Sequence, residues 1–270
     1  MTAASDLDLI LIYDFAPGAT QSDGPRPLAP SQYYTRLTQR LISALSSPTA
    51  EGQLYQVDMR LRPSGQKGPL ATQLSSFIEY QTNEAWTWEH MALTRARVIT
   101  GPPELRAKIE QTIRDVLVRP RDRAKIAADV RDMRQRIAAE KGTNEIWNLK
   151  HVRGGLVDLE FMAQYLQLIH AAEHPDVLDQ NTVLALQKVD SKGLIPGGAG
   201  AILISAARLL NDLTQIVRLC VDGPFRADEA SQGLKDLLAR AADAPSFDRL
   251  EADLRHMLAE TAAQFDRVIS

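Results

Sequence analysis

Cysteine is nearly absent from this sequence, in which Cys220 is the single one among 270 residues. One cysteine cannot form a disulfide within the chain, which excludes a small fold held together by disulfides and is typical of proteins of a reducing cytosol. Cys220 falls on the apolar face of an expected helix. We therefore predict a buried small side chain there rather than a reactive thiol.

Long apolar runs and an excess of positive charge are also missing. No segment approaches the roughly 20 apolar residues that span a bilayer. The first residues carry neither the basic segment nor the apolar core of a signal peptide. The formal net charge is −3, which argues against broad electrostatic capture of nucleic acid. We expect a cytoplasmic protein that binds neither membrane nor nucleic acid.

The pattern of the chain changes near Gly101-Pro102-Pro103. Before this point, short apolar strands alternate with helices, and after it helical spacing dominates to the C-terminus. We predict strands over 7–13, 53–62 and 95–100 and helices over 31–45, 74–93 and about 200–221, with Ser31 as the N-cap of the first helix. The sequence therefore predicts an α+β domain over residues 1–103, followed by an all-helical domain over residues 104–270.

Two carboxylates stand at the start of the first expected strand. Asp6 and Asp8 are two residues apart, so both side chains lie on one face of the strand. Like charges placed together at the edge of a core are costly unless a cation lies between them. Mg²⁺ prefers such oxygen ligands, above all when a nucleotide phosphate completes its shell. The alternative is a solvated Asp-x-Asp pair with no ligand.

A third carboxylate lies on the second expected strand. Asp58 shares a polar face with Gln56, Arg60 and Arg62, opposite an apolar face. With Asp6 and Asp8 it would complete a two-metal site, and the arginines would neutralise charge on a transferred phosphoryl group. The alternative is an exposed sheet face with a weak Asp–Arg pair, worth less than ~1 kcal/mol.

Longer motifs extend this interpretation. The segments 5–14 (SDLDLILIYD), 55–65 (YQVDMRLRPSG), 83–90 (NEAWTWEH) and 154–161 (GGLVDLEF) resemble those of the glutamine synthetase adenylyltransferase/adenylyl-removing enzyme family. The resemblance covers essentially the whole chain, and the 83–90 run resembles the C-terminal, adenylylating half of that family. It implies a nucleotidyltransferase-type mixed sheet with helices, followed by a helical domain like that of PII-uridylyltransferases.

The resemblance also implies an activity, which is transfer of AMP from ATP to a tyrosine of glutamine synthetase, in regulation of nitrogen assimilation. Asp6, Asp8 and Asp58 would be the catalytic metal ligands for Mg²⁺, and Ser5, Arg60 and Arg62 would bind the nucleotide. Glutamine synthetase would be the protein substrate, and a PII signalling protein a further partner. Weaker candidates are Trp86, Trp88 and His90, which would either flank the substrate or base or belong to the core. Asp158 and Glu160 stand at a helix start and would face either the cleft or the helix dipole.

The sequence departs from the family at its start. Family members carry a strand and a glycine-rich, phosphate-binding turn before the first aspartates, whereas Ala3-Ala4-Ser5 stands here. We therefore expect an N-terminally truncated fragment of a longer protein, with activity reduced by the lost phosphate contacts. Two alternatives remain open, a catalytically poor module that binds glutamine synthetase or PII, and a PII uridylyltransferase.

Overall fold

The computed structural model describes residues 5–52 and 55–270, which form two compact units. Unit 1 contains the described residues up to 89 together with 97–116, and unit 2 contains residues 90–96 and 117–270. Ala3 and Ala4, which stand where the family carries its phosphate-binding turn, lie outside the described residues. The predicted domain boundary between residues 103 and 104 stays a prediction.

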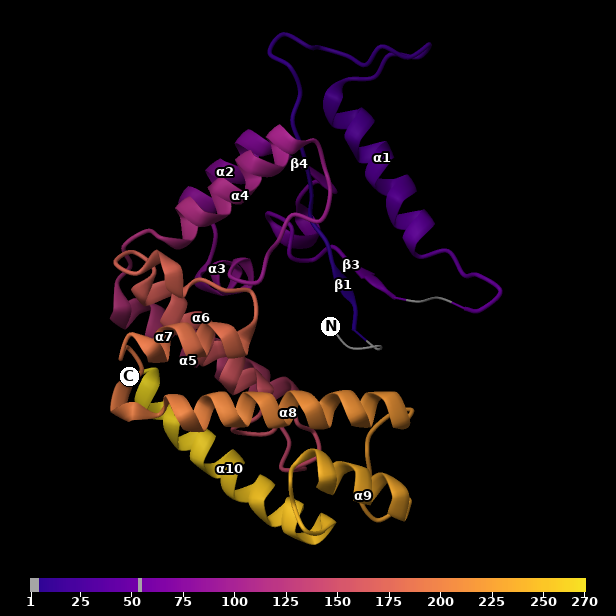
Figure 1. Cartoon of the computed structure of the whole chain (residues 1–270). Helices are drawn as coiled ribbons and strands as arrows, with labels where there is room; N and C mark the ends of the chain where they lie inside the picture. Colours follow the sequence, from indigo (N-terminus) through magenta and orange to yellow (C-terminus); the bar gives the residue numbers. More distant parts are fainter. Residues whose placement is uncertain (1–4, 53–54) are drawn as a thin grey trace. The chain divides into compact units, whose positions relative to one another are not determined.

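Unit 1 combines short strands with helices (Figure 1). In chain order its elements are β1 (Leu7–Asp8), β2 (Leu11–Tyr13), α1 (Pro30–Leu45), β3 (Val57–Asp58), β4 (Ala71–Gln73), α2 (Leu74–Asn83), the start of α3 (Thr87–Leu93) and α4 (Pro103–Leu117). β1 pairs in parallel with β3, and β2 pairs in parallel with β4. Parallel strands need a crossover between them, and α1 lies in the connection from β2 to β3.

The strands are shorter than the sequence predicted. The expected strand over 7–13 is interrupted at Leu9 and Ile10, and its two parts pair with different partners. In the described part of the chain, these two pairs do not join into the predicted mixed sheet. The expected strand over 95–100 is wrong, because backbone turns occupy its start, with Arg95 and Ala96 amides donating to carbonyls three residues earlier.

The expected strand over 53–62 is reduced to β3, and residues 53–54 lie outside the described part. The cause is local hydrogen bonding. The Asp58 carboxylate accepts from the Arg60 backbone N–H at 2.7 Å, and the Arg62 N–H donates to the Met59 carbonyl at 3.3 Å. A side chain that captures nearby backbone donors turns the chain and ends the ladder.

The helix expected over 74–93 divides into α2 and α3. Glu89 causes the break, since its buried carboxylate accepts from the Trp86 backbone N–H at 2.9 Å and from the Tyr80 hydroxyl at 2.8 Å. A carboxylate that binds backbone N–H groups in this way starts a new helix. The expected helix over 31–45 is confirmed as α1, but its N-cap is Ala29 rather than Ser31, because Pro30 has a preset φ suited to the first turn.

Unit 2 is built from helices (Figure 1). They are α5 (Arg123–Lys141), α6 (Leu156–His170), α7 (Thr182–Ser191), α8 (Gly200–Cys220), α9 (Gln232–Ala241) and α10 (Phe247–Val268), with short 3₁₀ turns at Pro175–Val177 and Pro196–Gly198. α6 is the central helix, packed against α5, α7, α8 and α10, and it buries Leu159, Met162 and Leu166 completely. The combination of unit 1 and unit 2 makes the chain an α+β protein.

α8 confirms the helix expected over 200–221, but Cys220 is exposed there, so the prediction of a buried cysteine was wrong. The apolar face of α8 is buried as far as Leu213, and the last turn of the helix extends past the packed core.

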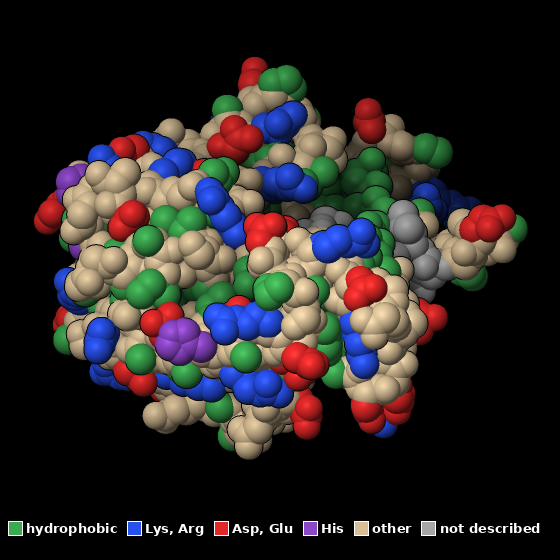
Figure 2. Space-filling model, turned by 60° about the horizontal axis from the view of Figure 1, so that its bottom comes forward, with side chains coloured by type: hydrophobic (Ala, Val, Ile, Leu, Met, Phe, Trp, Pro, Cys, Tyr) green, Lys and Arg blue, Asp and Glu red, His purple; other side chains and the backbone are tan. Residues whose placement is uncertain are grey.

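No helix in the described residues has the length and apolar character to cross a membrane. Figure 2 shows acidic and basic side chains interspersed over one face of the molecule.

Asp158 is completely buried in the first turn of α6. One carboxylate oxygen pairs with Arg134, and the other accepts from Arg153 at 2.9 Å and from the backbone N–H of Gly154. All of these partners belong to unit 2. Asp158 therefore does not face a cleft, as one interpretation of the sequence allowed, and it anchors the start of α6 to α5. Glu160 pairs with Arg95 at 2.9 Å.

Gly154 supplies a test of this junction. Its φ is +80°, and a Cβ added there would lie 1.9 Å from the backbone carbonyl oxygen of Leu258 in α10. We expect Gly154→Ala to lower the free energy of unfolding by about 2–4 kcal/mol, from backbone strain plus forced separation of the α6 start and α10. Urea denaturation measures the change. Gly193→Ala is the matched control, because Gly193 has φ +68° with no atom within 4 Å, and strain alone should cost about 1–2 kcal/mol. Equal losses would contradict the close packing at Gly154.

Candidate functional site

The pairing of β1 with β3 brings two of the three predicted aspartates together. Asp8 lies in register with Asp58, and the ladder is held by hydrogen bonds from Leu7 N–H to the Gln56 carbonyl at 2.8 Å and from Leu9 N–H to the Asp58 carbonyl at 2.9 Å. In-register residues of neighbouring strands project to the same face, and so do residues two apart on one strand. The backbone therefore places Asp6, Asp8 and Asp58 on one face of the β1–β3 pair.

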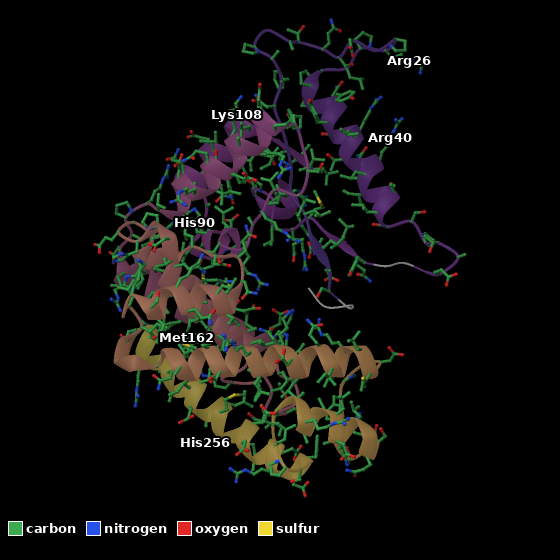
Figure 3. The ribbon with its side chains drawn as sticks, in the orientation of Figure 1. Arg26, Arg40, His90, Lys108, Met162 and His256 are labelled. Atoms are coloured by element: carbon green, nitrogen blue, oxygen red, sulfur yellow. The ribbon has the colours of Figure 1, made fainter. Side chains whose placement is uncertain are left out.

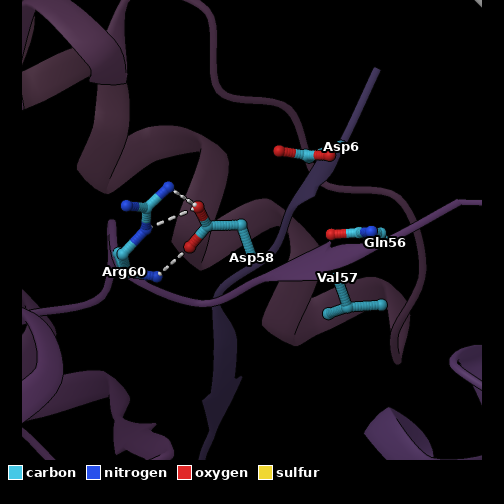
Figure 4. Close-up of a pocket in the computed structure, with 5 residues that line it drawn as sticks. All are labelled: Asp6, Gln56, Val57, Asp58 and Arg60. Atoms are coloured by element: carbon cyan, nitrogen blue, oxygen red, sulfur yellow. Dashed lines mark hydrogen bonds and ion pairs between the residues drawn. The ribbon is translucent and has the colours of Figure 1, made fainter. Parts of the chain in front are cut away.

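A pocket of about 240 Å³ opens on this face. Its lining residues are Asp6, Gln56, Val57, Asp58 and Arg60 (Figure 4). Asp6 is exposed, whereas the Asp58 side chain is only 14% exposed, so the pocket runs from solvent to a half-buried carboxylate. Asp8 is exposed on β1 and is not among the lining residues.

Arg60 is the cation of the pocket. Its Nε donates to Asp58 Oδ2 at 2.7 Å, its Nη2 lies 2.5 Å from the same oxygen, and its backbone N–H donates to Asp58 Oδ1 at 2.7 Å (Figure 4). The hydrogen bond to Asp58 raises the pKa of Arg60, and the negative charges of Asp8 and Asp6 raise that pKa further. All three carboxylates therefore stabilise the positive charge of the same guanidinium, that of Arg60.

The same hydrogen bond from Arg60 lowers the pKa of the Asp58 carboxyl below its ordinary value. We expect an NMR titration of the Asp58 carboxyl to show this depression in the wild type and to show a higher pKa in Arg60→Gln, since the substitution removes the charged donor. A folded-state pKa below the unfolded one stabilises the fold above the unfolded pKa, and the stabilisation is lost as the pH falls through the folded value. The stability difference between wild type and Arg60→Gln should therefore shrink in acid. An unchanged Asp58 pKa in the variant would contradict the ion pair.

Arg62 does not face the pocket. Its buried guanidinium donates to the carbonyls of Met59 at 2.7 Å, Gln66 at 3.2 Å and Gly68 at 3.3 Å. These bonds hold the turn after β3 closed, because each satisfies a carbonyl that has no strand partner. β3 ends before Arg62, so the strand alternation assumed for this residue stops, and the nucleotide contact expected for Arg62 stays a prediction. The nucleotide contact expected for Ser5 stays a prediction.

Gln56 was missed as a candidate, although strand alternation had placed it beside Asp58. Its side chain lies next to Asp6 on the pocket wall (Figure 4).

Among the aromatic candidates, Trp86 is 68% exposed, so it is not a core residue. His90 belongs to unit 2, where its Nδ1 lies 2.8 Å from Arg121 Nη1.

The carboxylates match Mg²⁺ in donor type, since hard oxygen ligands are what it binds. Within residues 5–52 and 55–270, however, no three His, Cys, Asp or Glu side chains are gathered closely enough to hold a metal ion. At Asp58, Arg60 donates to both carboxylate oxygens and so already provides a positive charge. A divalent ion at this site would have to share Asp58 with Arg60 or displace it.

Comparison with known proteins adds family evidence to this geometry. Residues 1–112 match the family model described as glutamate-ammonia ligase adenylyltransferase, and residues 123–268 match that of GlnD PII-uridylyltransferase. Similar relatives are named bifunctional glutamine synthetase adenylyltransferase/adenylyl-removing enzyme. They include proteins of Bradyrhizobium sp. strain BTAi1 (55% identical over 100% of the chain) and Xanthobacter autotrophicus strain Py2 (52% identical over 100% of the chain). The chain spans 27% of the length of each of these relatives.

Proposed function

Because the chain belongs to the family of bifunctional glutamine synthetase adenylyltransferase/adenylyl-removing enzymes, we propose that it transfers AMP from ATP to a tyrosine of glutamine synthetase and releases pyrophosphate. The observation that carries this proposal is the register of Asp8 with Asp58, with Asp6 and Asp58 lining one pocket. Three carboxylates on one strand-pair face are suited to phosphoryl-group chemistry.

The proposal includes the architecture. Residues 1–103 form a nucleotidyltransferase-type domain, and residues 104–270 form a helical domain like that of PII-uridylyltransferases. The separate family matches over 1–112 and 123–268 support this division. Which half of the longer relatives the chain represents stays a prediction, as does binding of a PII protein.

In this reaction Asp6, Asp8 and Asp58 would hold Mg²⁺ once Arg60 shares or releases Asp58, and the ion would polarise the phosphate oxygens of ATP. The tyrosine oxygen bonds to the α-phosphorus while the bond from that phosphorus to pyrophosphate breaks, and the tyrosine proton leaves to solvent or a carboxylate. Asp58 is a weak base when paired with Arg60, because its pKa is lowered. We assign it the orientation of the hydroxyl, and we assign Arg60 the neutralisation of charge on the transferred group.

Labelled nucleotide tests the reaction class. The chain is incubated with Mg²⁺, labelled ATP or UTP, and either glutamine synthetase or a PII protein as acceptor. We expect pyrophosphate release and label on a glutamine synthetase tyrosine with ATP alone. Label from UTP on the PII protein would support a uridylyltransferase instead. Complex formation without any pyrophosphate release would identify a binding module and overturn the proposal.

A further inference from the structure

Helix α1 carries a row of large apolar side chains on its outer face. Tyr33, Leu37, Leu41 and Leu45 are 43%, 44%, 43% and 41% exposed. They are spaced four residues apart, so they form one continuous ridge along the helix, which we call the α1 ridge. Single exposed apolar side chains are ordinary on protein surfaces, but a contiguous row of four marks an interaction site.

Residues outside the α1 ridge also hold α1 in place. Thr38 is completely buried and its hydroxyl donates to the Tyr34 carbonyl at 2.8 Å. The Tyr34 ring stacks on Tyr13 of β2 with centroids 4.2 Å apart, and its hydroxyl donates to the Asp14 carbonyl at 3.3 Å. α1 also packs against β4. The ring stacking, the hydrogen bond to Asp14 and the packing on β4 join the helix to the rest of unit 1 and leave the α1 ridge partly exposed.

The charge beside the α1 ridge has one sign. Arg36 and Arg40 are exposed and form the neighbouring row of the helix, and residues 30–45 contain no acidic side chain. Figure 3 shows Arg40 projecting from α1 away from the strands. An apolar ridge with a positive border is complementary to an apolar helix or groove with an acidic border. A two-fold contact with a second copy would repeat the same patch and gather four arginines at one interface, which is unfavourable.

We propose that the α1 ridge docks the protein that accepts AMP, through an apolar surface bordered by acidic side chains on that protein. This inference rests on the proposed function, since a protein acceptor must be recognised by more surface than one tyrosine and a small pocket provide. α1 lies in the same unit as the pocket, and along the chain it follows Asp6 and Asp8 and precedes Asp58. A row of residues at i, i+4, i+8 and i+12 favours a partner helix that crosses at about −50°.

The test is a pair of leucine substitutions in the 270-residue chain. Leu37→Ser combined with Leu41→Ser should raise the KM for glutamine synthetase about tenfold, as loss of central apolar anchors does. The kcat/KM for a short tyrosine peptide should change less than about twofold, because the pocket is untouched. Leu219→Ser is the matched control, since Leu219 is 73% exposed on α8 and should leave both values unchanged. Arg36→Glu combined with Arg40→Glu should slow association and reverse its salt dependence.

Direct binding of glutamine synthetase to immobilised chain separates this inference from the proposed function. Weaker binding by the leucine pair than by Leu219→Ser supports docking even if the wild type transfers no AMP, in which case the proposed function alone fails. An unchanged KM and unchanged binding would overturn docking. Two further results would also overturn docking. If the leucine-pair variant differed from wild type only in sedimentation, the α1 ridge would be a contact with a second copy. If it differed only in thermal stability, the α1 ridge would serve the fold.

Discussion

Asp6→Asn and Asp8→Asn are each expected to lower the rate of AMP transfer to glutamine synthetase by at least about 10²-fold, or roughly 2.7 kcal/mol in transition-state stabilisation. Each substitution keeps the shape of the side chain but removes the negative charge that a metal ligand needs. Asp6, which precedes β1, and Asp8, which lies on β1, are both exposed, so the fold should be preserved. Initial rates of pyrophosphate release at saturating ATP measure the effect, and circular dichroism checks the fold.

Asp23→Asn is the control for these two variants, because Asp23 lies exposed in the loop before α1 and should have no effect. Asp58→Asn should also abolish transfer, but it removes the partner of Arg60 at the same time, so its effect combines ligand loss with release of the arginine. Retained turnover in either Asp6→Asn or Asp8→Asn would contradict the assignment of these carboxylates.

Asp158→Asn is expected to lower the free energy of unfolding by about 3–5 kcal/mol, the usual cost of breaking a buried ion pair from one side. The variant leaves the guanidinium of Arg134, whose side chain is 6% exposed, without its carboxylate partner. It also weakens the bonds from Arg153 and Gly154 that join the start of α6 to its neighbours. Since whole domains have stabilities of about 5–15 kcal/mol, the loss should be visible as a large fall in the urea midpoint.

Asp253→Asn is the matched control, because Asp253 pairs with Arg249 on the surface, where the two side chains are 50% and 62% exposed. It should cost less than about 1 kcal/mol. If Asp158→Asn instead left the stability unchanged and lowered only the rate of AMP transfer, Asp158 would be a residue of the active site rather than a structural anchor.

The sequence predicted those features that depend on residues close together in the chain. The period of α1 and of α8 was readable because apolar side chains recur at helical spacing, and the shared face of Asp6 and Asp8 follows from strand alternation alone. The register of Asp8 with Asp58 needs a pairing between strands 50 residues apart in the numbering, and no local pattern encodes it. The expectation that Asp58 belongs to the same site as Asp6 and Asp8 was instead supported by the resemblance of the longer motifs to the family.

The errors arose where one side chain overrides the local pattern. Asp58 turns the chain by accepting the Arg60 N–H, so the alternation assumed through Arg62 stops and Arg62 serves the turn. Glu89 caps a new helix and divides the one expected over 74–93. Asp158 was expected at a helix start, facing either the cleft or the helix dipole, and its burial depends on Arg134 and Arg153 approaching from elsewhere in the unit. Such contacts are tertiary, and residue spacing does not reveal them.

Binding of a divalent ion is the most direct test of the three-aspartate site. Mn²⁺, which takes the same oxygen ligands as Mg²⁺, can be titrated into the chain with ATP present and followed by electron paramagnetic resonance. The predicted result is saturable binding by the wild type and by Asp23→Asn, weakened at least about tenfold in Asp6→Asn, Asp8→Asn and Asp58→Asn. Equal Mn²⁺ binding by the wild type and all three site variants would contradict a metal site built from these carboxylates.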